Sequence, residues 1–270
     1  MQDERRKTGK TGVKMETVTT LEGKTGILYN NIVFEPRAAY GEVRKKQLRY
    51  DASLADVKSR RYTRHPRPQE VFSLLIADLE NKLTPEQKSV ADDILNSYGE
   101  WLSTAVERNG NRFTIYTDPE GLVWNGLLYV KQNFRFESKR DFSAAGVASA
   151  TWVDLNKFGS DLVEFLYTRK FEQLPQVMRE GDRRAQVYLP PDGQIWPAGL
   201  SSFYNRFNID CRNYDSRASR GVVPQEQLLE EKLAEELSRL DKYVGNINDT
   251  PYKKEKKEIL QEFRRKLTPK

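Results

Sequence analysis

Histidine and cysteine, which often act as nucleophiles, general bases and zinc ligands, each occur once in this chain of 270 residues. The histidine, His65, lies in the basic run Arg-His-Pro-Arg, and the cysteine is Cys211. One of each cannot form a Cys/His zinc site, and both Ser-His-Asp and Cys-His catalysis would have to use His65. Its neighbours favour an exposed basic linker, so we expect neither a bound metal nor a catalytic triad.

Phosphate-binding and other catalytic motifs are also missing. Two Gly-Lys-Thr triplets start at Gly9 and Gly23, but Glu4 and Val18 stand where a phosphate-binding loop needs its first glycine. No Gly-x-Gly-x-x-Gly, Gly-x-Ser-x-Gly, Cys-x-x-Cys or His-Glu-x-x-His occurs. We therefore expect no cofactor and no enzymatic activity. An enzyme whose carboxylates come from distant strands is the third alternative, because one sequence cannot reveal such a pair.

Aromatic and arginine side chains interleave in the segment from 196 to 222. Guanidinium planes that stack on aromatic rings suit RNA bases or the surface of a partner protein. The other interpretation is a loop whose aromatic rings close the core while its arginines stay in water. The candidate contact residues of this segment are Trp196, Phe203, Tyr204, Arg206, Arg212, Tyr214, Arg217 and Arg220.

The N-terminal residues 1–66 are predicted to be an extended basic arm, partly disordered when free. Residues 1–70 hold 16 Lys and Arg against 9 Asp and Glu, so they carry the whole positive excess of a chain of net charge +6. Aromatic residues come singly between charges, as in an arm that lies along a partner; an arm that wraps its own domain is an equal alternative. The candidate contacts are Tyr29, Phe34, Tyr40, Tyr50 and Tyr62.

The scaffold that must position these residues is clearest between Arg112 and Phe136. Short β-branched and aromatic runs are separated by Asp-Pro-Glu-Gly at 118–121 and Asn-Gly at 125–126. Both are turn sequences, and Asn-Gly is a strong hairpin signal. They predict an antiparallel meander of three or four strands, with Trp124 in its core.

Helices are predicted before and after this meander. Apolar residues at helical spacing indicate a helix at 69–82, and a capping box at Thr84 opens a second helix that continues to Asn109. Later in the chain the pattern indicates a helical piece that starts at Asp154 or Ser160 and runs to about Arg169, and another at 171–181, followed by a strand hairpin at 185–196.

The last 48 residues read as two helices, 223–244 and 251–270, each with a seam of apolar residues. The first helix holds more acids than bases and the second more bases than acids. Opposite charges favour pairing between antiparallel helices, which predicts a helical hairpin.

These elements together predict an α+β fold: a small antiparallel β-meander packed with helices, an extended basic N-terminal arm and a C-terminal antiparallel helical hairpin. The expected domains are the arm at 1–66, the α+β core at 67–222 and the hairpin at 223–270. No apolar run reaches the ~20 residues of a membrane span, the first residues lack the apolar core of a secretory signal, and a single cysteine favours a reducing compartment. A targeting segment removed before this numbering stays an open alternative. We therefore expect a soluble, intracellular protein.

An arm that cannot fold alone and a projecting hairpin are what a subunit of a larger assembly needs. The function expected first is thus a non-catalytic structural, linker or adaptor subunit that binds other protein subunits through the arm and the hairpin. The alternative is an RNA- or DNA-associated protein that uses residues 1–70 and the aromatic and arginine segment.

Overall fold

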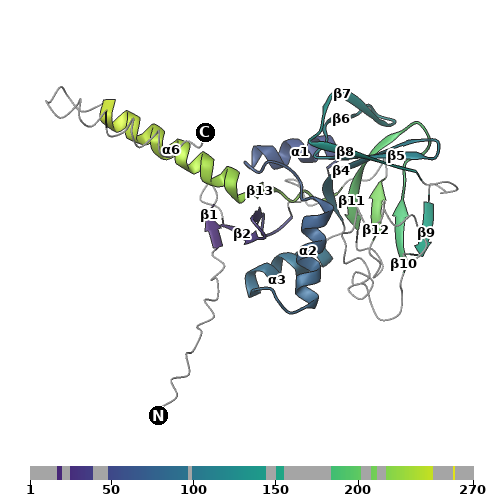
Figure 1. The fold of residues 1–270 in the computed structure, drawn as a ribbon, viewed down its shortest axis with the longest axis horizontal. Helices are drawn as coiled ribbons and strands as arrows, with labels where there is room; N and C mark the ends of the chain where they lie inside the picture. Colours follow the sequence, from purple (N-terminus) through teal and green to yellow (C-terminus); the bar gives the residue numbers. More distant parts are fainter. Residues whose placement is uncertain are drawn as a thin grey trace, which may run out of the picture. The chain divides into compact units, whose positions relative to one another are not determined.

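The computed structural model describes residues 17–19, 25–38, 48–96, 99–143, 150–154, 184–201, 208–211, 217–245 and 258. The chain divides into two compact units, Met1–Pro224 (unit 1) and Gln225–Lys270 (unit 2). Unit 1 combines helices with mainly antiparallel sheets, which confirms the α+β class (Figure 1).

A seven-stranded sheet of order β8-β5-β4-β11-β12-β10-β9 is the largest element of unit 1. Its neighbouring strands are antiparallel, except that β10 and β12 run parallel. The middle of β4 is buried on both faces, as expected for a central strand. The strands are β4 (Glu100–Asn109), β5 (Arg112–Thr117), β8 (Ser138–Ser143), β9 (Ala150–Asp154), β10 (Arg184–Tyr188), β11 (Ile195–Ser201) and β12 (Asn208–Cys211).

The predicted hairpin at 185–196 is wrong, because β12 lies between β10 and β11. The turn that follows β10 is attached to the end of β4 instead. The backbone N–H of Gly193 donates to the carbonyl of Arg108 at 2.9 Å, and Ile195 then pairs with Glu107. A partner strand distant in sequence has replaced the local one.

Two of the predicted helices form the pair α2 (Pro68–Leu79) and α3 (Pro85–Asn96). The capping box is present: the N–H of Thr84 donates to Gln87 Oε1 at 3.1 Å, and the N–H of Gln87 donates to Thr84 Oγ1 at 3.4 Å. The predicted continuation of the second helix to Asn109 is wrong, since those residues form β4. A spacing of four places Leu102 and Val106 on one face of a strand as well as of a helix. Pairing with β5 and β11 is what makes these residues a strand.

The strands of the expected meander are present, but they do not form one sheet. β6 (Glu120–Trp124) and β7 (Tyr129–Arg135) make a separate two-stranded hairpin, whereas β5 pairs with β4 and β8. The Asn-Gly turn is confirmed, with Asn125 Oδ1 accepting from the N–H of Leu128 at 2.9 Å. Trp124 is half-buried at the edge of the core, which corrects its predicted place inside it.

A second sheet joins the two ends of unit 1 in the order β1-β2-β3-β13. Before α2 the chain also forms a helix, α1 (Tyr50–Ser59), where an extended arm was expected. The described residues between 25 and 66 therefore include secondary structure that is part of unit 1. The strands are β1 (Thr17–Thr19), β2 (Thr25–Tyr29), β3 (Ile32–Phe34) and β13 (Val222–Pro224).

Unit 2 contains α6 (Gln225–Gly245), which agrees with the helix predicted at 223–244. Leu229 is 58% exposed on this helix. Residues 251–270, apart from Glu258, lie outside the described residues. The helical pieces predicted from Asp154 or Ser160 to 169 and at 171–181 lie outside them too, except that Asp154 is the last residue of β9. The C-terminal helical hairpin thus stays a prediction. No helix within the described ranges is long and apolar enough to cross a membrane.

Candidate functional site

The aromatic residues proposed as contacts of the arm pack within unit 1 where they are described. Phe34, Tyr50 and Tyr62 are buried, and Tyr29 is half-buried, with its hydroxyl donating to the Ser73 carbonyl at 2.9 Å. Tyr40 lies outside the described residues. The described part of the arm therefore wraps its own unit, and we do not propose Tyr29, Phe34 or Tyr62 as partner contacts.

The segment from 196 to 220 supplies buried residues too. Trp196, Arg217 and Arg220 are all buried, and Arg217 Nη1 donates to the Leu200 carbonyl at 3.0 Å. The remaining candidates lie outside the described residues: Phe203, Tyr204, Arg206, Arg212 and Tyr214.

Arg220 is the centre of a buried ion-pair cluster. Its Nε and Nη2 each lie 2.8 Å from a carboxylate oxygen of Glu100, and Nη2 also donates to Asp93 Oδ2 at 2.5 Å. Burial alone would lower the pKa of Arg220, but the Glu100 and Asp93 carboxylates overcome it and raise that pKa. The guanidinium is thus permanently charged, and its ion pairs join the segment just before β13 to α3 and β4.

His65 is fully buried, so the expected exposed basic linker at 64–67 is wrong. Its Nδ1 lies 3.2 Å from the Arg220 carbonyl, and its Nε2 lies 3.2 Å from Ser53 Oγ. A carbonyl can only accept, so Nδ1 carries the proton and Nε2 accepts from the serine. Burial lowers the pKa of His65 to about 3, which keeps the ring neutral.

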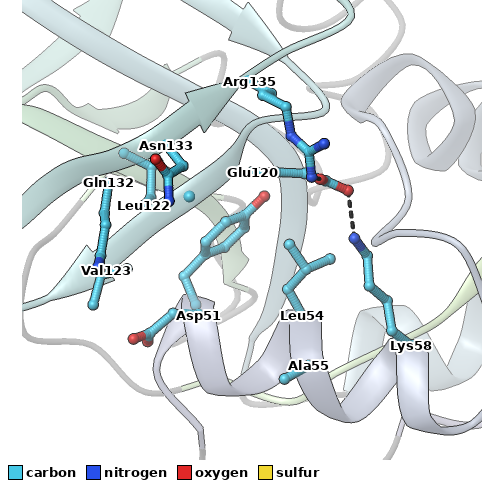
Figure 2. Close-up of a pocket in the computed structure, with 12 residues that line it drawn as sticks. Asp51, Leu54, Ala55, Lys58, Glu120, Leu122, Val123, Gln132, Asn133 and Arg135 are labelled. Atoms are coloured by element: carbon cyan, nitrogen blue, oxygen red, sulfur yellow. Dashed lines mark hydrogen bonds and ion pairs between the residues drawn. The ribbon is translucent and has the colours of Figure 1, made fainter.

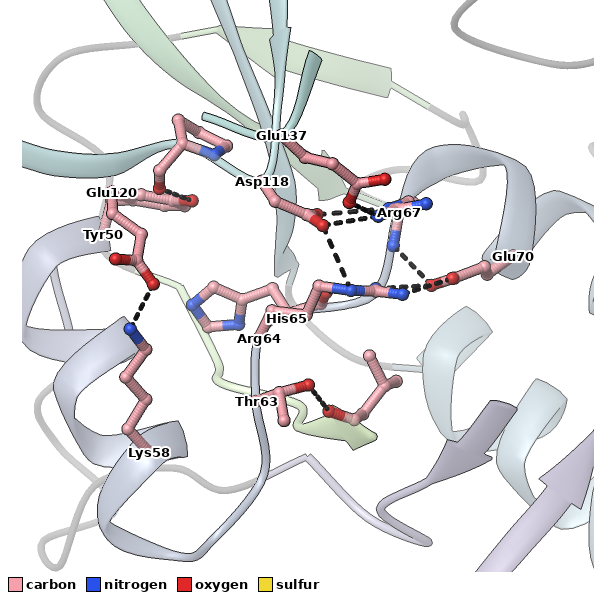
Figure 3. A network of polar contacts seen from close by, with 12 residues as sticks. Tyr50, Lys58, Thr63, Arg64, His65, Arg67, Glu70, Asp118, Glu120 and Glu137 are labelled. Carbon is pink, nitrogen blue, oxygen red and sulfur yellow. Dashed lines mark hydrogen bonds and ion pairs between the residues drawn. The ribbon is translucent and has the colours of Figure 1, made fainter. Parts of the chain in front are cut away.

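The arginines beside His65 form a second network, shown in Figure 3. Arg64 binds both carboxylate oxygens of Glu70, at 2.8 and 2.6 Å, while Arg67 Nη2 binds Asp118 at 2.6 Å and also contacts Glu137. Burial would raise the pKa of Asp118, but Arg67 and Arg64 lower it. A hydrogen bond to Asp118 raises the pKa of Glu137. The network joins the start of α2 to the turn before β6.

An open cavity in the described residues lies between α1 and the β6–β7 hairpin and has a volume of about 350 Å³. We call it the α1–hairpin pocket (Figure 2). Apolar, amide and charged groups all line it. The lining residues are Tyr50, Asp51, Leu54, Ala55, Lys58, Glu120, Gly121, Leu122, Val123, Gln132, Asn133 and Arg135.

Both walls of the pocket are firmly attached to unit 1. The N–H of Tyr50, at the start of α1, donates to Tyr129 Oη at 3.1 Å, and the Tyr50 hydroxyl donates to the Pro119 carbonyl at 3.1 Å. The Tyr50 ring also packs edge-on against Trp101, with centroids 5.6 Å apart. These contacts join α1 to β7, to the turn before β6 and to β4. They hold the two walls together, so the pocket is preformed.

Positive charge prevails at one end of the pocket. Lys58 and Arg135 both pair with Glu120, the arginine at 2.9 Å, and their side chains are 45% and 79% exposed. The hydrogen bond from Lys58 lowers the pKa of Glu120, which is therefore ionised. Two cations facing one carboxylate leave a net positive end that solvent and ligands can reach.

The other end of the pocket carries the carboxylate of Asp51. Its Oδ2 accepts from the backbone N–H of Trp124 at 3.3 Å. The guanidinium of Arg49 lies over the Trp124 ring, 3.9 Å from its centroid, and covers the indole. In Figure 2, Asp51 and Lys58 lie at opposite ends of the pocket, with Leu54 and Ala55 between them on α1.

Tyr50 is the one lining residue that the sequence had indicated as a candidate contact. Asp51, Leu54 and Lys58 are spaced by three and four, which places them on one face of a helix. That spacing was a usable signal for α1. The opposite wall had a signal too, in the predicted hairpin, but nothing local indicates that the two elements meet.

No family model, curated protein or solved structure matches this chain. Within the described residues, no group of three or more His, Cys, Asp or Glu side chains could hold a metal ion.

Proposed function

We propose that this protein is a non-catalytic adaptor subunit that binds another protein of a larger assembly, and that the α1–hairpin pocket is a contact site. The observation that carries the proposal is the preformed open pocket itself, with an apolar wall and charges at both ends. Such a combination suits the recognition of a partner segment, because apolar area supplies affinity and placed charges supply specificity.

The state of the charged groups favours binding over proton transfer. A general acid at neutral pH needs a carboxyl group with a raised pKa, whereas Lys58 lowers the pKa of Glu120. The carboxylate instead holds the two cations in place, as a specificity element would.

The arm and the C-terminal helices remain part of this proposal. The described part of α6 presents a half-exposed leucine seam among acidic residues, in which Leu229 is 58% exposed. Residues 1–16 carry more basic than acidic side chains. Both segments would extend the contact with the assembly beyond the pocket.

Association with RNA or DNA is the second candidate. A cluster of Tyr116, Phe134 and Phe136, with ring centroids 5.0 to 5.7 Å apart, leaves Phe136 41% exposed. Lys131 lies over two of these rings. An exposed ring beside a cation can stack on a nucleic acid base.

Site-specific photocrosslinking in cells of the source organism tests the proposal. A photoreactive phenylalanine analogue at Ala55, in the pocket wall, should crosslink to a discrete protein. The same analogue at Ala52 is the matched control, because this residue is exposed on α1 and does not line the pocket. Equal yields at the two positions contradict the pocket as the contact site, and nucleic acid adducts at Ala55 favour the second candidate.

A further inference from the structure

We propose that the α1–hairpin pocket recognises an extended peptide segment with an acidic and a basic side chain about three residues apart and an apolar residue between them. This inference rests on the proposed function and adds the chemistry of the bound segment. The acidic side chain would lie at the Lys58 and Arg135 end, and the basic side chain at the Asp51 end.

The charges of the pocket define two complementary ends. Lys58 and Arg135 share the single carboxylate of Glu120, so a second carboxylate added there completes two ion pairs. One carboxylate oxygen of Asp51 accepts from a backbone N–H of the hairpin, which holds the carboxylate in place. The other oxygen can accept a hydrogen bond from a ligand cation. A ligand with both charges matches the pocket better than a ligand with either charge alone.

The distance between the two ends sets the length of the segment. Asp51 and Lys58 are seven residues apart on α1, a rise of about 10 Å at 1.5 Å per helical residue. A segment in the extended polyproline II conformation advances ~3.1 Å per residue with three residues per turn, so side chains three residues apart lie on one face and span nearly the same distance. The distance between Asp51 and Lys58 on α1 thus sets the spacing of the two charges along the bound segment.

The wall between the two ends supplies the remaining contacts. Leu54, which is half-buried, offers apolar surface, and the side-chain amides of Gln132 and Asn133 can bind peptide groups. Gly121 brings the backbone of the two hairpin strands close together, because a Cβ there would collide with the Gln132 carbonyl. A flat polar and apolar wall of this kind fits a peptide backbone with one apolar side chain.

Four synthetic peptides and the full chain test the inference. The peptides are acetyl-Gly-Glu-Leu-Val-Lys-Gly-amide and its counterparts with Glu at both charged positions, Lys at both, or Gln at both. Binding is measured by titration, from the NMR shifts of the Gly121 and Leu54 backbone amides. The wild-type chain should bind the Glu/Lys peptide roughly 3–5-fold more tightly than any counterpart, as expected for exposed charge pairs.

Charge-swap variants make the test specific. In Lys58→Glu the preference should move to the Lys/Lys peptide, and in Asp51→Lys it should move to the Glu/Glu peptide. Lys88→Glu, on α3 and outside the pocket lining, is the matched control and should keep the wild-type order. An unchanged thermal transition confirms that each variant is folded.

Equal binding of the Gln/Gln peptide, or the same order in all variants, overturns the inference. Absence of any shift at the pocket amides overturns it as well. These outcomes leave the proposed function to the crosslinking at Ala55, so the two can fail separately. If protein adducts form at Ala55 while the peptides show no charge preference, the pocket binds a partner of another chemistry.

Discussion

Arg220 shows at the scale of single residues how this chain uses its charges. The side chain is fully buried, and Glu100, which meets it with both oxygens, is buried as well. Removal of one member of such a pair leaves the other as an uncompensated charge in a medium of low polarity.

Glu100→Gln should therefore lower the free energy of unfolding by about 3–5 kcal/mol. The control is Glu236→Gln, which breaks the exposed ion pair with Arg239, where the side chains are 62% and 70% exposed. That pair should contribute ~0.5 kcal/mol or less. Denaturant titration of both variants gives the comparison, and similar losses would contradict a buried structural role for the Arg220 cluster.

His65 predicts a pH dependence of stability. Burial lowers its pKa to about 3 in the folded protein, against 6.5 as the ordinary value. Between these pH values the unfolded chain binds a proton at His65 that the folded chain does not. The stability that the neutral ring contributes is therefore fully present above pH 6.5 and is lost as the pH falls toward 3.

The expected slope is up to ~1.4 kcal/mol per pH unit from this single residue. His65→Gln should show a shallower loss of stability between pH 6.5 and 5 than the wild-type chain. Because the chain has one histidine, the NMR signal of its ring can be followed alone. A ring that titrates near pH 6.5 in the folded protein would refute the buried neutral state.

At the scale of elements, the β6–β7 hairpin depends on two glycines for different reasons. Gly126 has φ of 100° at the tip, with nothing near the position of a Cβ, while Gly121 has φ of 77° and a Cβ would meet the Gln132 carbonyl. Backbone conformation alone restricts the first position, and conformation together with contact restricts the second.

Gly126→Ala should cost about 1–2 kcal/mol, the usual strain of a left-handed residue. Gly121→Ala should cost about 3 kcal/mol or more, since the collision adds to that strain. It should also shift the NMR signals of the pocket residues on α1, which Gly126→Ala should leave in place. Thermal denaturation of both variants measures the two losses of stability, and NMR follows the pocket residues. Equal losses of stability would mean that the hairpin backbone adapts at Gly121.

At the scale of the whole molecule, the division at Pro224 predicts how the chain can be shortened. Unit 1 ends with β13, whose Val222 and Val223 are buried and pair with β3. A chain of residues 1–224 keeps this strand, whereas a chain of residues 1–216 loses it together with Arg220.

The chain 1–224 should unfold cooperatively at a temperature within a few degrees of the full chain, because it retains every strand described in unit 1. The chain 1–216 should fail to fold, since it leaves Glu100 and the edge of β3 without partners. Calorimetry and circular dichroism distinguish the two. Loss of the transition in 1–224 would show that unit 2 is needed for the stability of unit 1.

The sequence by itself determined the elements whose signals are local. The capping box at Thr84, the Asn-Gly turn at 125 and the heptad-like leucines of α6 each lie within a few residues of the structure they specify. Such signals act through backbone conformation and nearest neighbours, so they depend on tertiary context less than strand pairing does.

Only the tertiary structure decided which strands pair, which charges are buried and where the pocket forms. β12 separates β10 from β11, and Glu100 meets Arg220 across 120 residues of sequence. His65 carries no local mark of burial, since its basic neighbours are neutralised by distant carboxylates such as Asp118. The free energy of these contacts arises when segments far apart in sequence share a desolvated space, so no local pattern records it.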